Sequence, residues 1–359
     1  MNYNSYQGYD DFYKAVYPDY DKDRTRKVVS RLFLALCVYT LISYAVVFLS
    51  EFFVLLVFGR EKMMTILESP YYIFSVQIIS MYLIALPVFM LICRTGITKI
   101  SEEQKLKREA QKRNSSMSFE EMVVLFFIST AVMIIGGLIS NMFTGLLSNI
   151  LGHRIENSTA ELISKTPIWL VIAVAVIIGP IVEEFIFRKT MIDILGEFGR
   201  GYAITVSAVA FGLFHGNFSQ ALYATLLGFI LGFIYLKSGK LLHCAAMHIA
   251  LNFFGTVPTL LLGGSIDRIS EGTLTPEGGL ALDYLNDLKN VIGLALLQYG
   301  CAIAGIALFC HFVFAKKYKV SFAKELTIPR YEVAHVTFAN PGVITFIIFT
   351  IIQFVISIL

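Results

Sequence analysis

The chain has 359 residues, of which 56% are apolar and 15% charged, and its mean hydropathy is +0.70. Soluble domains carry about a quarter charged residues, so this composition indicates a polytopic membrane protein and excludes soluble dehydrogenases, kinases and nucleic-acid-binding domains. The net charge of +3 is too small to indicate a polyanionic partner. Five cysteines lie in apolar stretches without CxxC spacing, which argues against a disulfide framework or a structural zinc site.

The amino-terminal 31 residues are rich in Tyr, Asp, Lys and Arg. They lack the short apolar run and the small-residue cleavage site of a signal peptide. We therefore expect residues 1–31 to form a cytoplasmic tail, and we expect the first apolar stretch to remain as a membrane anchor.

Apolar stretches recur along the rest of the chain. A bilayer core about 30 Å thick requires about 20 apolar residues per helix. The sequence therefore predicts an all-α polytopic membrane fold with eight or nine transmembrane helices, and the fifth stretch is the shortest. The nine candidate stretches are 32–58, 72–93, 121–148, 167–187, 202–215, 219–236, 241–262, 290–315 and 341–359.

The distribution of Lys and Arg predicts the orientation of these helices, because both residues gather on the cytoplasmic side. The tail contains six of them, residues 94–113 contain seven and residues 316–330 contain five. The loops 59–71, 149–166 and 263–284 contain only one or two each. We therefore expect the amino terminus inside, the carboxyl terminus outside and a basic cytoplasmic loop at 94–119. The short loops and the lack of a targeting segment favour a multi-pass protein of a bacterial cell membrane.

Two adjacent carboxylates, Glu183 and Glu184, follow a long hydrocarbon run within the fourth stretch. A charge at this depth costs about 2.5–3.5 kcal/mol and calls for an explanation. Glu184 and Arg188 stand four residues apart on one helical face, so we expect an ion pair between them. Glu183 points about 100° away, which favours it as the reactive group. The alternative is a buried salt bridge that only fixes helix packing.

Two further pairs show the same four-residue spacing: Phe211 with His215, and His248 with Asn252. An imidazole beside a carboxamide makes a polar stripe on an apolar helix. This stripe has to face protein or a cavity, since lipid satisfies no hydrogen bond.

The three patterns EExxxR, FxxxH and HxxxN follow one another on hydrophobic stretches. In this order they resemble the CAAX-protease and bacteriocin-processing family of intramembrane proteases, also called the Abi family. All seven positions match, and the resemblance covers about 167–262. It leaves 32–148 and 263–359 as flanking membrane regions without a family motif.

This resemblance implies an all-helical catalytic core in the fourth to seventh stretches, with a cavity open to the cytoplasm. Glu183 and His215 would activate the attacking water, while His248 and Asn252 would polarise the scissile carbonyl and hold the oxyanion. Glu184, Arg188 and Phe211 would support them. The substrate would be a peptide or a membrane protein within the bilayer.

The residue chemistry agrees with these roles, since peptide hydrolysis requires a base, an electrophilic stabiliser and a confined water. Other intramembrane protease patterns fit poorly, because the sequence has no HExxH helix, no GxGD with a membrane YD and no rhomboid-like GxSG with a membrane histidine.

A zinc ion is the alternative means of activating the water. Glu183, His215 and His248 supply the ligand types of catalytic zinc, and the family is commonly named a metalloprotease. However, the three ligands come from three separate stretches, and Asn252 suits an oxyanion better than a metal. We therefore expect no obligatory metal.

Two other functions remain open. The intramembrane Glu and His residues are also compatible with a transporter or proton relay, although no paired repeat is evident. A bacteriocin-immunity scaffold without cleavage is the third reading. The sequence indicates neither an oligomeric state nor a particular substrate.

Overall fold

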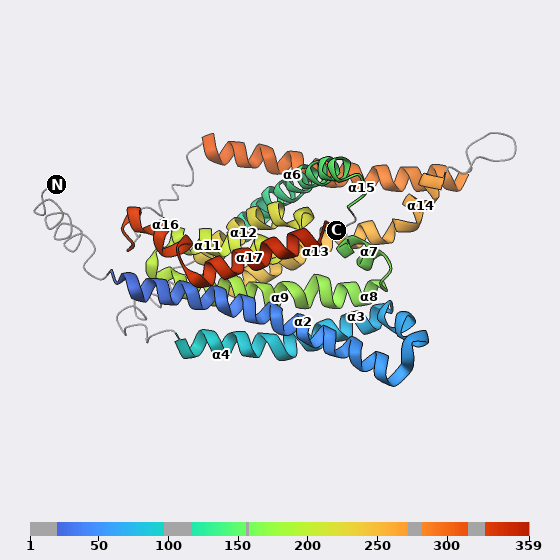
Figure 1. Ribbon diagram of the computed structural model, residues 1–359. Helices are drawn as coiled ribbons and strands as arrows, with labels where there is room; N and C mark the ends of the chain where they lie inside the picture. The colour runs from blue at the N-terminus through green and yellow to red at the C-terminus, as the bar shows by residue number, and fades with distance from the viewer. Residues whose placement is uncertain (1–19, 97–115, 156–157, 272–281, 315–326, 359) are drawn as a thin grey trace, which may run out of the picture. The chain divides into compact units, whose positions relative to one another are not determined.

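The computed structural model describes residues 20–96, 116–155, 158–271, 282–314 and 327–358. Every regular element in these ranges is a helix, and no strand occurs in them (Figure 1). The chain divides into two compact units that alternate along the sequence. Unit 1 comprises Met1–Ser115, Phe185–Asn217 and Val320–Leu359, and unit 2 comprises Ser116–Glu184 and Phe218–Lys319.

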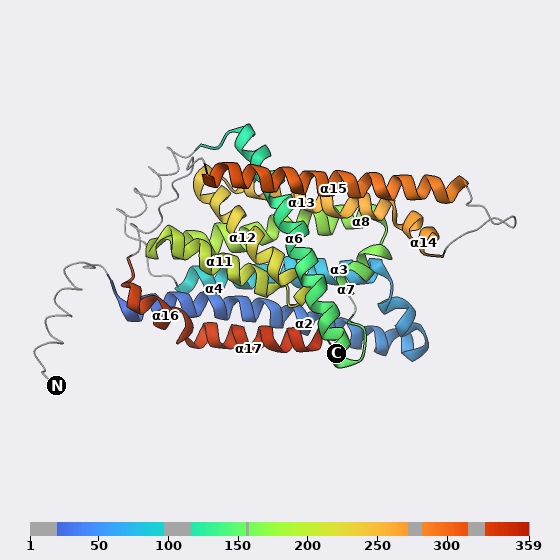
Figure 2. The same ribbon diagram turned by 90° about the horizontal axis from the view of Figure 1, so that it is seen from above.

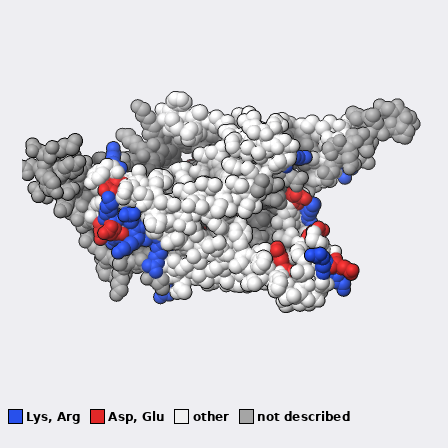
Figure 3. Space-filling model, in the orientation of Figure 1, with Lys and Arg blue, Asp and Glu red and all other residues white. Residues whose placement is uncertain are grey.

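Unit 1 begins with the 46-residue helix α2 (Lys22–Leu67), which Asp21 caps by accepting a hydrogen bond from the Arg24 backbone N–H. A positive φ at Gly59 kinks this helix. In Figure 3 charged side chains lie at both ends of α2, and the surface along the middle of this helix is white. The remaining helices of unit 1 are α3 (Pro70–Gln77), η1 (Ile78–Ala85), α4 (Leu86–Gly96), η3 (Phe185–Ile192), α10 (Asp193–Leu195), η4 (Gly196–Phe198), α11 (Arg200–Phe214), α16 (Arg330–Phe338) and α17 (Pro341–Ile356).

An aromatic cluster joins four helices of unit 1. Tyr39 of α2 lies with its ring centroid 6.3 Å from that of Phe89 and 5.6 Å from that of Phe214. Phe187 of η3 contacts Phe211 and Phe214, at centroid distances of 5.1 and 5.3 Å. The pairs that include Phe89, Phe187 and Phe211 meet edge to face, the arrangement that aromatic quadrupoles favour. This packing fixes α11, whose C-cap residue is one of the motif histidines.

The carboxyl-terminal helix α17 packs along α2, and the two lie side by side in both ribbon views (Figures 1 and 2). At Gly342 a Cβ atom would overlap the carbonyl group of Ser30, so only glycine permits this approach of the two backbones. Small residues at contacts of this kind are typical of helices that associate in a membrane.

Unit 2 is built around α6 (Phe119–Leu151), which packs against α12 (Phe218–Ser238) and α15 (Leu282–Phe314). Ser118 and Glu121 form a capping box at the start of α6, and Glu121 also pairs with Lys237 near the end of α12. Gly305 lets α15 lie against the backbone of Phe127. The other helices of unit 2 are α7 (Ser158–Ser164), α8 (Ile168–Val171), η2 (Ile172–Ile178), α9 (Gly179–Glu184), α13 (Leu241–Leu261) and α14 (Gly263–Glu271).

Several of these helices could cross a membrane. Among the described residues seven are long and apolar enough, and the pair α16 and α17, bent by 58°, gives an eighth. The seven are Lys22–Leu67, Pro70–Arg94, Phe119–Leu151, Ile168–Phe198, Phe218–Ser238, Leu241–Leu261 and Tyr284–Phe314. The prediction of an all-α polytopic membrane protein is confirmed.

The count of nine spans is too high, because two predicted spans are shorter than a crossing helix. The stretch 202–215 corresponds to α11, which has 15 residues and so is about 22 Å long, against a hydrocarbon core of about 30 Å. The stretch 341–359 corresponds to α17, which has 16 residues and reaches a membrane-spanning length only together with α16.

Two sequence predictions fall partly outside the described residues. Residues 97–115, which contain most of the predicted basic loop 94–119, are outside them, as are residues 1–19 of the predicted tail. The predicted division at residues 31, 148, 167 and 262 stays a prediction. Part of the predicted loop after 262 forms the helix α14.

Candidate active site

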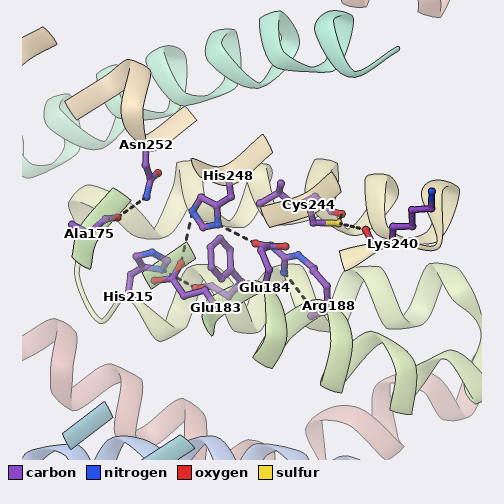
Figure 4. A network of polar contacts seen from close by, with 12 residues as sticks. Ala175, Glu183, Glu184, Arg188, His215, Lys240, Cys244, His248 and Asn252 are labelled. Atoms are coloured by element: carbon purple, nitrogen blue, oxygen red, sulfur yellow. Dashed lines mark hydrogen bonds and ion pairs between the residues drawn. The ribbon is translucent and has the colours of Figure 1, made fainter. Parts of the chain in front are cut away.

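The seven motif residues lie on four helical segments, and all of them except Phe211 are labelled in Figure 4. In unit 2, α9 ends with Glu183 and Glu184, and α13 carries His248 and Asn252. In unit 1, η3 carries Arg188, while Phe211 lies near the end of α11 and His215 is its C-cap residue. Each unit brings its own motif residues together.

In unit 2 the buried carboxylate Glu184 binds His248. The Glu184 side chain is fully buried, and its Oε1 lies 3.0 Å from Nδ1 of His248. Since a carboxylate accepts, Nδ1–H of the imidazole donates. This bond fixes the ring orientation and turns Nε2 away from Glu184, as a carboxylate hydrogen-bonded to one nitrogen of a functional histidine commonly does.

Glu183 faces the other nitrogen of the same ring. Its Oε2 lies 3.8 Å from Nε2 of His248, which is too long for a direct hydrogen bond. The Glu183 side chain is 30% exposed, whereas those of His248 and Glu184 are 5% and 0% exposed. Glu183 is therefore the accessible member of the carboxylate pair, as expected for a group that meets a water molecule.

Asn252 lies one turn after His248 on α13 and is anchored to η2. Its Nδ2 donates to the carbonyl oxygen of Ala175 at 3.2 Å. A carboxamide has two N–H donors, so the second N–H of Asn252 is left for another acceptor. His248 and Asn252 thus form the polar stripe that the sequence predicted on this helix.

In unit 1 the guanidinium of Arg188 is fully buried. Its Nη1 lies 3.4 Å from Oγ of Ser207, and its Cζ lies 4.7 Å from the centroid of the Phe211 ring. The Ser207 hydroxyl in turn donates to the carbonyl oxygen of Phe187 at 2.8 Å. A hydroxyl and an aromatic face therefore hold the cation, the latter by a cation–π contact.

His215 closes α11 in a defined tautomer. Its Nδ1 lies 2.8 Å from the carbonyl oxygen of Phe211, and because a carbonyl can only accept, Nδ1 carries the proton. The Phe211 and His215 rings stand at 87° with centroids 5.0 Å apart. Nε2 is then the ring nitrogen that can act as an acceptor.

The residue after His215 reverses the chain. Gly216 has φ +65°, a left-handed conformation that glycine adopts without a Cβ clash. A Cβ atom here would lie 3.2–3.3 Å from the side chain of Gln353 on α17, and Gln353 donates to the Tyr44 hydroxyl at 2.9 Å. Helix α17 therefore packs against the turn that follows His215.

Three of these contacts were not predicted from the sequence. The contact between Glu184 and His248 joins positions 64 residues apart, which helical spacing does not reveal. Ser207 could have been found, because it precedes Phe211 by four residues as Phe211 precedes His215. The support of Gly216 by Gln353 has no local signal. The ion pair between Glu184 and Arg188 stays a prediction.

The described residues contain no group of three or more His, Cys, Asp or Glu side chains that could hold a metal ion. A zinc site formed by Glu183, His215 and His248 stays a prediction. We derive no chemical step through zinc.

Unit 2 also contains an open cavity of about 1310 Å³. Its walls come from the carboxyl-terminal half of α6, from α7 and from the segment between them, and they also include Ser219 and Ile266. None of the seven motif residues lines it.

Comparison with known proteins agrees with the motifs. Residues 165–254 match the model of the Rce1-like family, described as "Type II CAAX prenyl endopeptidase Rce1-like". The chain is also 29% identical over 180 residues to a Bacillus subtilis (strain 168) protein named "Putative membrane peptidase YdiL", and this alignment covers 50% of the chain and 69% of that protein. No solved structure gives a significant match. The segment 165–254, which holds all seven motif residues, is thus similar to the Rce1-like family of CAAX endopeptidases, and this similarity supports the resemblance to the CAAX-protease and bacteriocin-processing family.

Proposed function

We propose that this protein is an intramembrane endopeptidase that hydrolyses a peptide bond of a membrane-associated protein or peptide. The observation that carries the proposal is the arrangement around His248: Glu184 is bonded to Nδ1, the accessible Glu183 faces Nε2, and Asn252 lies one turn away. The proton acceptor Glu183 thus lies near His248 and Asn252, two potential hydrogen-bond donors to a developing oxyanion.

Glu183 is the general base of this proposal. Its carboxylate takes a proton from water, whose oxygen attacks the scissile carbonyl carbon, and the same proton passes to the departing amine as the C–N bond breaks. A positioned base of this kind contributes about 10²–10⁴-fold to the rate.

His248 and Asn252 stabilise the oxyanion. Since Nδ1–H of His248 donates to Glu184, donation to an oxyanion uses a second proton on Nε2, and the ring is then an imidazolium. The carboxylates of Glu183 and Glu184 balance that charge. The second N–H of Asn252 adds another donor, and removal of one such donor typically lowers kcat by about 10²–10³-fold.

His215 works with Glu183 in this scheme, as the family resemblance implies. Its Nδ1–H donates to the Phe211 carbonyl, so Nε2 can accept a hydrogen bond from the attacking water and orient it while Glu183 takes the proton. Arg188 and Phe211 keep the roles of supporting residues.

No obligatory metal takes part in the proposed reaction. Stoichiometric zinc in active purified protein, with activity lost on treatment with a strong chelator and restored by zinc, would contradict this part of the proposal. Activity that persists after chelation in metal-free buffer would support it.

The first substrate to test is a quenched fluorescent peptide with a farnesylated CAAX terminus, because the matched family is described as a CAAX prenyl endopeptidase. In parallel, membrane proteomes of cells that express wild-type protein or Glu183→Gln are compared for new carboxyl termini. Glu51→Gln is the matched control, since Glu51 lies in the membrane-spanning helix α2 and outside the motifs.

We expect cleavage, or new carboxyl termini, with wild-type protein and Glu51→Gln and none with Glu183→Gln. Identical carboxyl termini for wild type and Glu183→Gln would contradict the proposal. A proton flux into proteoliposomes that depends on Glu183 without any cleavage would instead favour the transporter reading. Immunity to a bacteriocin that survives Glu183→Gln would favour the scaffold.

For the membrane orientation, we propose a cytoplasmic amino terminus. In an Arg60→Cys variant, the new cysteine near the kink of α2 should react with an impermeant maleimide added outside intact cells. The new cysteine of an Arg24→Cys variant should not react. The reverse pattern would overturn this orientation.

A further inference from the structure

The last turn of η2 has π-helical hydrogen bonding. The backbone N–H of Gly179 donates to the carbonyl oxygen of Val174, five residues earlier. In this register the next donor, at residue 180, would bind the carbonyl oxygen of Ala175. Single π turns of this kind are found frequently at functional sites.

Residue 180 is proline, which has no backbone N–H. The Ala175 carbonyl therefore lacks the backbone donor that the π register would supply. Water is scarce within the hydrocarbon core, so a carbonyl without a hydrogen-bond donor is strongly unfavourable there. The side chain that satisfies this carbonyl is Asn252, whose Nδ2 lies 3.2 Å from the oxygen.

We propose that Pro180 is a positioning residue for Asn252: by withholding an N–H, it keeps the Ala175 carbonyl open as an anchor for the carboxamide. The catalytic consequence rests on the proposed function, in which the second N–H of Asn252 donates to the oxyanion. Pro180 itself contacts no reacting atom in this scheme.

The chemistry of proline explains why another residue would serve less well. Any other amino acid at position 180 would bring an N–H that competes with Asn252 for the Ala175 carbonyl. Once the backbone satisfied that carbonyl, the carboxamide would lose its anchor and rotate among several conformers. Fewer molecules would then present a correctly aimed donor, and transition-state stabilisation would fall.

Pro180→Ala tests this inference. We expect kcat for the farnesylated CAAX peptide to fall about 10-fold with little change in KM, because substrate binding does not use this donor. Pro258→Ala is the matched control, since Pro258 also lies within a helix of unit 2 but outside the motifs. The control should retain wild-type kcat.

A double-mutant cycle separates positioning from general destabilisation. In an Asn252→Ala background, Pro180→Ala should cause no further loss of kcat, because the side chain that it misplaces is already absent. A loss that is multiplicative with that of Asn252→Ala would overturn the inference.

A second measurement does not depend on cleavage. Protein labelled with ¹⁵N-asparagine gives a side-chain NH₂ signal for Asn252, assigned by its absence in Asn252→Ala. Pro180→Ala should shift or broaden this signal, and Pro258→Ala should leave it unchanged. An unchanged Asn252 signal in Pro180→Ala would overturn the inference even in active protein. A shifted signal in protein that cleaves no substrate would uphold the anchor and contradict only the proposed function.

Discussion

The two motif histidines occupy opposite chemical environments. His248 of unit 2 has Glu184 at Nδ1 and Glu183 opposite Nε2, so anions face both nitrogens. His215 of unit 1 donates Nδ1–H to a backbone carbonyl and packs its ring against Phe211. We therefore propose two different roles for the same side chain: His248 holds positive charge, and His215 accepts a hydrogen bond from the attacking water.

The groups that surround the two histidines also differ in charge. Around His248, unit 2 supplies two carboxylates and a carboxamide, whereas near His215 unit 1 supplies the Arg188 guanidinium, a hydroxyl and aromatic rings. An exchange of roles between the two histidines would leave each with the wrong partners. The substitutions below test this contrast, from the largest expected effect to the smallest.

Among the substitutions that test this contrast, His248→Gln should have the largest effect, because it removes the imidazole that both carboxylates face. We expect kcat to fall about 10³-fold or more, with the protein still inserted in the membrane. His243→Gln, on the same helix but outside the motifs, is the control. Equal activity of the two variants would show that His248 is a packing residue.

Glu184→Gln should lower kcat by about 10²-fold and also lower the thermal midpoint in detergent. The amide can still accept from Nδ1–H of His248, but it no longer balances an imidazolium. Differential scanning fluorimetry with parallel kinetics measures both effects. Wild-type activity in Glu184→Gln would refute the charge-balancing role and leave only packing.

Gly216→Ala should lower kcat about 10-fold and cost about 1–2 kcal/mol of stability, since an alanine at φ +65° is strained. Gly145→Ala is the control, because no atom lies within 4 Å of an added Cβ there. If both variants behave alike, the turn after His215 does not position the histidine.

Ser207→Ala should have the smallest effect, a loss of a few-fold in kcat with about 1–2 kcal/mol of stability. It leaves the Phe187 carbonyl without its side-chain donor and removes one acceptor from Arg188. Ser43→Ala is the control, because it deletes another buried hydroxyl of unit 1, which donates to the carbonyl oxygen of Tyr39. A larger kcat loss for Ser43→Ala than for Ser207→Ala would argue against a specific role.

The all-helical membrane fold could be predicted from hydropathy, because apolar length determines which segments cross a bilayer. The error at 202–215 has a simple cause: apolar composition does not distinguish a short buried helix from a crossing one. Several residues of α11, such as Ala203, Ala208 and Phe211, are buried against protein, so their apolar character reflects packing rather than lipid exposure.

The candidate residues could also be predicted, since charged and imidazole groups stand out in hydrocarbon and recur at four-residue spacing. The hydrogen-bond partners of these residues could not be predicted from the sequence. The spacing of Glu184 and Arg188 indicated a helical neighbour, but it could not reveal that His248, 64 residues away, binds Glu184 at 3.0 Å. Nor could it show that Ala175 anchors Asn252, since this depends on the π register of η2.

The most direct test of the account is hydrolysis in H₂¹⁸O. Purified protein is incubated with the farnesylated CAAX peptide or with a substrate found by carboxyl-terminal proteomics, and the products are analysed by mass spectrometry. The account predicts one ¹⁸O in the new carboxyl terminus with wild-type protein, and about 10⁴-fold slower product formation with folded Glu183→Gln. Labelled product formed at the wild-type rate by Glu183→Gln would contradict the central claim that Glu183 activates the water.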